Sequence, residues 1–149
     1  MNIITEGMEG GNSPTNAIWL DPSQSAASAV TINAPVNISM SGGYGGNGIA
    51  VAKTTRFGEA SYTSSGTNKI TINGDVKIAG KYYNIWGIPL NGENVYSRFN
   101  NAGILTSVNN SVVDINGNID FTIYGNGITT NAAGSKVIVD GAKLQCLSR

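Results

Sequence analysis

The chain has 149 residues and a formal net charge of zero, and only 12% of its residues are charged. A neutral, charge-poor chain lacks the basic surface that nucleic acids and anionic membranes require, and no apolar run approaches the roughly 20 residues of a membrane-spanning helix. Because the chain contains no His and a single Cys, His-based catalysis, His-ligated metals and a disulfide framework are excluded, and we expect no cofactor.

The first segment, residues 1–16, is polar and glycine-rich and lacks the basic start and apolar core of a signal peptide. We predict that it caps a single domain covering residues 1–149, whose repeated structure occupies residues 17–146. Short runs there alternate apolar and polar residues with a period of two, and no helical periodicity is present. The sequence therefore predicts an all-β chain.

Three segments along the chain share one pattern, in which two short strands flank a corner rich in Asn and Gly. These segments are residues 30–38, 70–78 and 113–121, with corners beginning at Asn33, Asn73 and Asn116. The segment from Gly103 to Gly117 then recurs at an offset of 24 residues, with Asp140 at the position of Asn116. Relative to this offset, the earlier repeats carry insertions, which we place at about residues 53–68 and 81–101.

Repeats of three short strands in about 24 residues predict a parallel β-helix of about four to six coils with two loop insertions, because one coil cannot bury its apolar side alone. Its interior columns would be Ile32–Ile72–Ile115–Val139, Val30–Ile70–Val113–Val137 and Val36–Val76–Ile119, and the corner residues would form a ladder. Antiparallel hairpins are the alternative, because Asn-Gly is also a strong hairpin turn. The repeated third strand beginning Gly-Ile favours the β-helix.

The repeat, Gly-Ile-x-x followed by a loop and Ser-x-Val-x-Ile-Asn-Gly-x-Val-x-Ile, resembles the passenger repeats of bacterial autotransporters of the pertactin-like and AIDA-like adhesins. The resemblance covers about residues 17–146. It implies a right-handed β-helix, exported through the outer membrane and either secreted or displayed on the bacterial cell surface, where such passengers act in adhesion and virulence. The chain shows no signal peptide and no barrel of alternating strands, so it is similar to a segment of a passenger.

Aromatic residues gather in the second insertion, and Tyr, Trp and Arg are the residue types that dominate binding hot spots. We therefore predict a ligand-binding site formed by Tyr82, Tyr83, Trp86, Tyr96, Arg98 and Phe99. The alternative is that these side chains only pack the loop onto the coil. The expected partner is a host or neighbouring-cell surface protein or a glycan.

Other candidate sites are weaker. Asp114, Asn116, Asn118 and Asp120 have the spacing of half a calcium loop, but Ile119 stands where that loop needs Gly. Polysaccharide-active β-helices use acids on a groove, and Asp75, Asp114 and Asp120 with Lys77 are the candidates for one face. Thr31 and Thr71 would begin an ice-binding column that Asp114 and Ile138 interrupt. Cys146 is interpreted as a small core residue.

Two function classes remain open besides a polysaccharide-active enzyme, which we do not expect. The first is an adhesion or binding module that uses the insertions, and the second is a structural spacer without a ligand. A β-helix also has unpaired strand edges at both ends. Residues 1–16 and 142–149 must cover these edges, or the chain should associate end to end.

Overall fold

The computed structural model describes residues 1–6, 15–22, 27–41, 46–52, 66–81, 102–123, 126–141 and 144–147. Every regular element in these ranges is a β-strand, so the expected all-β class is confirmed. The same ranges contain no helix of the length and apolarity needed to cross a membrane.

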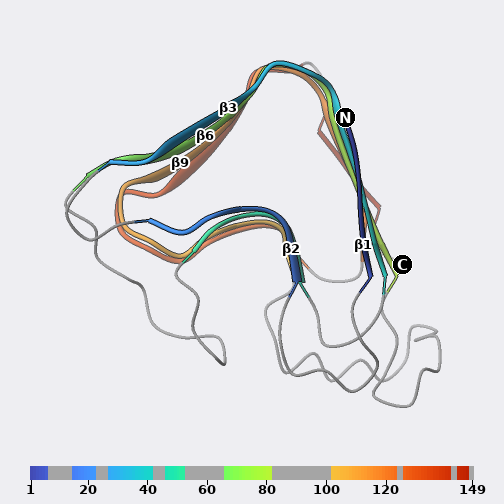
Figure 1. Ribbon diagram of the computed structural model, residues 1–149, viewed down its shortest axis with the longest axis horizontal. Helices are drawn as coiled ribbons and strands as arrows, with labels where there is room; N and C mark the ends of the chain where they lie inside the picture. Colours follow the sequence, from blue (N-terminus) through green and yellow to red (C-terminus); the bar gives the residue numbers. More distant parts are fainter. Residues whose placement is uncertain are drawn as a thin grey trace, which may run out of the picture.

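The strands form three parallel sheets, named A, B and C here (Figure 1). Sheet A consists of β1 (Asn2–Glu6), β4 (Val36–Ser41), β7 (Val76–Lys81), β10 (Ile119–Thr122) and β13 (Leu144–Leu147). Sheet B consists of β2 (Thr15–Leu20), β5 (Gly46–Val51), β8 (Ala102–Thr106) and β11 (Asn126–Thr130). Sheet C consists of β3 (Ala29–Ile32), β6 (Asn68–Ile72), β9 (Ser111–Ile115) and β12 (Lys136–Val139).

The chain visits sheets A, B and C in turn and then returns to sheet A, and one such trio of strands is called a pass. Figure 1 shows the strands of successive passes lying over one another around a three-sided outline. All described strand pairs are parallel, which is the arrangement of a parallel β-helix and not of antiparallel hairpins.

The apolar columns predicted from the repeat are confirmed by the strand register. Ile115 lies between Ile72 and Val139 on the neighbouring strands of sheet C, and Ile32 continues the column beyond Ile72. The second column on sheet C and the column on sheet A also have the predicted members. Side chains of the middle passes, such as Ile72 and Ile115, are fully buried. Each such side chain contributes roughly 1.5–3 kcal/mol by leaving water.

The corner between sheets C and A has the same short form in each described pass. The Asn73 side-chain Nδ2 donates to Asn33 Oδ1 at 2.6 Å, and Asn116 Nδ2 donates to Asn73 Oδ1 at the same distance. This confirms the predicted ladder for its three Asn members. The corners stack so closely that a Cβ on Gly117 would lie 2.5 Å from the carbonyl carbon of Gly74. A larger residue than Gly therefore cannot occupy this corner without moving the backbone.

The glycine of the Gly-Ile pattern has a separate cause in sheet B. A Cβ on Gly103 would lie 2.5 Å from Cδ1 of the buried Phe121 ring, and one on Gly48 would lie 2.7 Å from Cδ1 of Ile78. Phe121 and Ile78 belong to sheet A, whose side chains reach across the interior to the backbone of sheet B. The repeated Gly therefore makes room for the largest interior side chains.

The offset of 24 residues is confirmed where β8 and β9 pair with β11 and β12. The first predicted insertion, 53–68, is only partly correct, because Asn68 already belongs to β6. Residues 52–67 make the connection that residues 107–110 make in the next pass, a difference of 12 residues from the register. The rest of the expected 16-residue extension therefore lies between β4 and β5.

The N-terminal segment differs from the cap predicted for residues 1–16. Asn2–Glu6 forms β1, the edge strand of sheet A, and pairs in register with β4. Ile3 takes the register position of Ile38 and packs against the core, so this segment continues the stack. At the other end, Cys146 of β13 has the register position of Phe121.

Candidate functional site

Differences in chain length are concentrated at two of the three corners. Residues 7–14, 42–45, 82–101 and 123–125 join sheet A to sheet B, and residues 21–28 and 52–67 are the first two connections from sheet B to sheet C. In Figure 1, the described ends of the strands joined by the first set lie together at one corner of the outline. The corner from sheet C to sheet A shows no such variation among the described residues.

The longest connection begins after Lys81, at the end of β7, and ends before Ala102, at the start of β8. The predicted insertion of 81–101 is therefore bounded by two strands of the solenoid. Its six predicted binding residues, namely Tyr82, Tyr83, Trp86, Tyr96, Arg98 and Phe99, lie outside the described residues. Their grouping into a binding site stays a prediction.

The start of β8, where this connection returns to the solenoid, is rigidly held. Ala102 is buried, and its backbone N–H donates to Asn47 Oδ1 of the preceding pass at 3.1 Å. Asn47, which is also buried, donates through Nδ2 to Asn16 Oδ1 at 2.8 Å. A hydrogen-bonded column of sheet B thus fixes this anchor of the loop, as a scaffold that presents a loop requires.

The carboxylates considered for catalysis are not brought to one face, contrary to the arrangement considered from the sequence. Asp114 lies on the outer face of sheet C, where its Oδ2 is 2.6 Å from Lys69 Nζ. Asp75 lies at the corner from sheet C to sheet A, and its Oδ1 accepts the Asn118 backbone N–H at 2.8 Å. Only Asp120 and Lys77 are neighbours, on adjacent strands of sheet A.

The half calcium loop is dispersed by the same corner. Asp114 lies on sheet C and Asp120 on sheet A, while Asn116 joins the side-chain ladder and Asn118 bonds to Asp75. The strand-corner-strand path therefore sends the four side chains in different directions. The described residues contain no group of three or more acidic or Cys side chains placed to hold a metal ion.

The outer column of sheet C has the composition expected from the repeat. Thr31 and Thr71 are followed in register by Asp114 and Ile138. This column is not a regular Thr array, because its last two members are a paired carboxylate and an apolar side chain that is 39% exposed.

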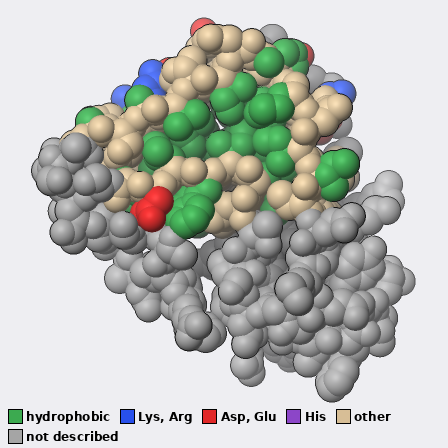
Figure 2. Space-filling view, viewed as in Figure 1, with side chains coloured by type: hydrophobic (Ala, Val, Ile, Leu, Met, Phe, Trp, Pro, Cys, Tyr) green, Lys and Arg blue, Asp and Glu red, His purple; other side chains and the backbone are tan. Residues whose placement is uncertain are grey.

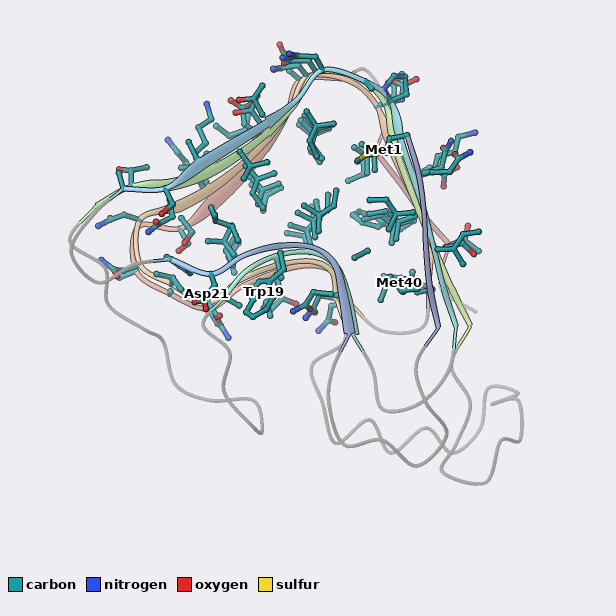
Figure 3. The ribbon with its side chains drawn as sticks, viewed as in Figure 1. Met1, Trp19, Asp21 and Met40 are labelled. Carbon is teal, nitrogen blue, oxygen red and sulfur yellow. The ribbon has the colours of Figure 1, made fainter. Side chains whose placement is uncertain are left out.

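Trp19 is a candidate contact residue that the sequence analysis missed. It lies on β2 near Asp21 and is 43% exposed (Figure 3), while its indole Nε1 donates to the Ala52 carbonyl at 2.7 Å. Its register neighbour Ala50 is fully buried. The available signal was the small residue that follows Trp19 in this column, which leaves room for an indole on the outer face.

No protein family model matches this chain, and neither the search of curated proteins nor that of solved structures finds a match.

Proposed function

We propose that this chain is a segment of a bacterial autotransporter-like passenger that acts as an adhesion or binding module. In this proposal the solenoid is a right-handed β-helix of about four to six coils, secreted or displayed on the cell surface. The support comes from the repeat that resembles such passengers and from the parallel stacking of the three sheets.

One observation carries the binding part of the proposal. The connections from sheet A to sheet B change in length from pass to pass, while the corner from sheet C to sheet A stays constant and hydrogen-bonded. A scaffold that is constant on one side and variable on another can present loops without losing register. Binding residues are disproportionately found on such loops.

The contact residues in this proposal are Tyr82, Tyr83, Trp86, Tyr96, Arg98 and Phe99. Aromatic and Arg side chains supply large contact area and directional hydrogen bonds, which suits a cell-surface protein or a glycan. The proposal involves no cofactor and no catalytic residue.

The test compares the full chain with a variant in which residues 82–101 are replaced by a single Gly. The register makes this replacement geometrically sound, because residue 125 alone occupies the equivalent interval between β10 and β11. Binding to arrays of glycans, to matrix proteins and to whole cells is measured for both proteins. We expect binding by the full chain and its loss in the variant.

A matched control shortens the other long connection. Residues 53–67 are replaced by Val-Asn-Asn, the sequence of residues 108–110, because Val51 and Asn68 have the register positions of Thr106 and Ser111. Ala52 is kept, since its carbonyl accepts the Trp19 indole. This control should bind as the full chain does.

A third variant keeps the length of the loop and replaces its five aromatic contact residues with Ser. Loss of binding in this variant assigns the contact to the side chains. If the full chain binds none of these targets, or if all variants bind equally, the adhesion proposal is wrong and a structural spacer is the better interpretation.

A further inference from the structure

The two ends of the stack expose the apolar side chains that the middle passes bury. The large hydrophobic residues exposed in the described part of the chain are Met1, Ile4, Trp19 and Val30 at one end and Ile128 and Ile138 at the other. Figure 2 looks onto the end formed by β1, β2 and β3, where hydrophobic side chains gather in the middle of a polar rim. Unpaired strand edges of this kind are templates for further strand pairing.

The side-chain ladders have a direction that distinguishes the two ends. In each printed Asn pair, the Nδ2 of the later pass donates to the Oδ1 of the earlier pass. The pairs are Asn37 to Asn2, Asn47 to Asn16, Asn73 to Asn33 and Asn116 to Asn73. Each ladder therefore ends on an unused donor at the β1–β3 end and on an acceptor at the opposite end.

Each sheet contributes one such donor at the first end. Asn2, Asn16 and Asn33 lie on sheet A, sheet B and the corner after sheet C, and within the described ranges their Nδ2 groups donate to no acceptor. At the other end the same columns terminate in residues with side-chain acceptors, namely Asp120 on β10, Asn126 and Asp140. Asp120 Oδ1 is buried and has no hydrogen-bond partner.

One strand stands in the way of a simple continuation of the stack. Sheet A has five strands and sheets B and C have four, because β13 lies beside β10 one level beyond β11 and β12. If β2 and β3 of another copy were to pair with β11 and β12, its β1 would require the position beside β10. β13 occupies that position, so the two strands compete for one site.

We propose that the end bearing β11 and β12 binds the β1–β3 end of a second copy of this chain, and that the incoming β1 displaces β13. The apolar columns then continue without a break, with Val30 and Ile32 of the second copy beyond Val137 and Val139. The incoming Asn33 and Asn2 donate to Asp140 and to the unpaired Asp120 Oδ1. β1 is the longer competitor, with five strand residues against four in β13.

The contact is heterologous, so it generates an open chain of copies and not a closed dimer. Displacement of β13 sets the barrier to this growth. This inference does not depend on the adhesion proposal, because it uses no residue of the 82–101 loop.

Disulfide trapping tests the proposed contact in the full chain. The protein carries Asn33→Cys and Asp140→Cys, with Cys146→Ala to remove the native thiol. Stacking places the two new thiols on neighbouring strands about 4.8 Å apart, which is within disulfide range. Within one copy the strands of Asn73 and Asn116 separate them. We expect a series of disulfide-linked multimers on a non-reducing gel.

The control pair is Ser39→Cys with Asp140→Cys in the same Cys146→Ala protein. Ser39 is exposed on the outer face of β4, away from both ends, so this pair should give monomers only. Equal multimer yield from the two pairs, or no multimers from the Asn33 pair, overturns the proposed contact.

The role of β13 is tested by weakening its pairing. Asn37 N–H donates to the earlier strand, and Gln145 has the register position of Asn37, so the N–H groups of Gln145 and Leu147 point at β10. Gln145→Pro with Leu147→Pro removes both donors and should speed multimer trapping about tenfold. Cys146→Pro, whose N–H points to the open edge, is the control, and equal rates overturn the displacement of β13.

A charge-matched pair of variants tests the ladder donors. Asn2→Asp still accepts from Asn37 Nδ2 but can no longer donate, and it faces the Asp120 carboxylate of the other copy. It should slow trapping about fivefold, whereas Ser39→Asp, with the same added charge, should not. An equal effect of both substitutions contradicts the proposed pairing of donor and acceptor ends.

Discussion

The corner between sheets C and A and the corner between sheets A and B solve the same problem in opposite ways. At the first, Asn side chains bond at 2.6 Å and the backbones of Gly74 and Gly117 nearly touch, so neither length nor residue size can change. At the second, the connection grows from residues 123–125 to residues 82–101 in the neighbouring pass. One rigid corner is thus enough to keep the strands in register while another takes up differences in length.

Loop-closure entropy explains why the second corner tolerates such growth, since each doubling of a flexible loop costs only about 0.6 kcal/mol. The rigid corner is under a different constraint, because an added residue there would separate side chains and backbones that are bonded to both neighbouring passes. The predictions below compare these two corners.

The largest expected effect comes from placing one insertion at both corners. Four residues, Ser-Gly-Ser-Gly, are inserted between Gly117 and Asn118 or between Tyr124 and Gly125. The first insertion breaks the Asn118 contacts to Asp75 and should cost about 4 kcal/mol of unfolding free energy, whereas the second should cost about 1 kcal/mol. Urea unfolding followed by circular dichroism measures both, and equal costs would contradict the distinction between the corners.

A smaller effect is expected from removing one side chain of the ladder. Asn73 donates to Asn33 and accepts from Asn116, so Asn73→Ala should lower the unfolding free energy by about 2 kcal/mol. Asn73→Asp keeps the acceptor and should lose about half as much. A loss in the Asp variant as large as that in the Ala variant would show that the acceptor contributes nothing.

The smallest expected effect is a gain in stability. Asp140 takes the ladder position after Asn116 but has no side-chain donor to offer Asn116 Oδ1. Asp140→Asn supplies that donor and should raise the unfolding free energy by about 1 kcal/mol. The gain should vanish when Asn116→Ala is also present, and a gain that survives in the double variant would have another origin.

The interior of the fold was accessible from sequence because a strand has a side-chain period of two, and a shift of one residue would expose every apolar side chain. That constraint correctly placed Ile115 between Ile72 and Val139 and put Asn73 in a ladder. The strand Asn2–Glu6 was missed because it has only one partner strand, so its polar composition outweighed its short apolar run.

The candidate site was less accessible for a physical reason. A loop sequence carries no periodicity, so the aromatic cluster between Lys81 and Ala102 could be located between strands but not arranged in space. The outer position of Trp19 depends on the size of Ala50 in the next pass, which is visible only when the register between passes is known. Likewise, the separation of Asp114 from Asp120 follows from the direction of one corner.

The uniform direction of the Asn ladders has an electrostatic consequence. Backbone hydrogen bonds in a parallel sheet point alternately along the solenoid axis, so their dipoles largely cancel. The side-chain amides of Asn37, Asn47, Asn73 and Asn116 all point the same way and therefore add. The solenoid carries a net dipole along its axis, positive at the β1–β3 end, and the Asp120 and Asp140 carboxylates strengthen its negative pole. In this respect a helix-free chain acquires the axial polarity for which α-helices are known.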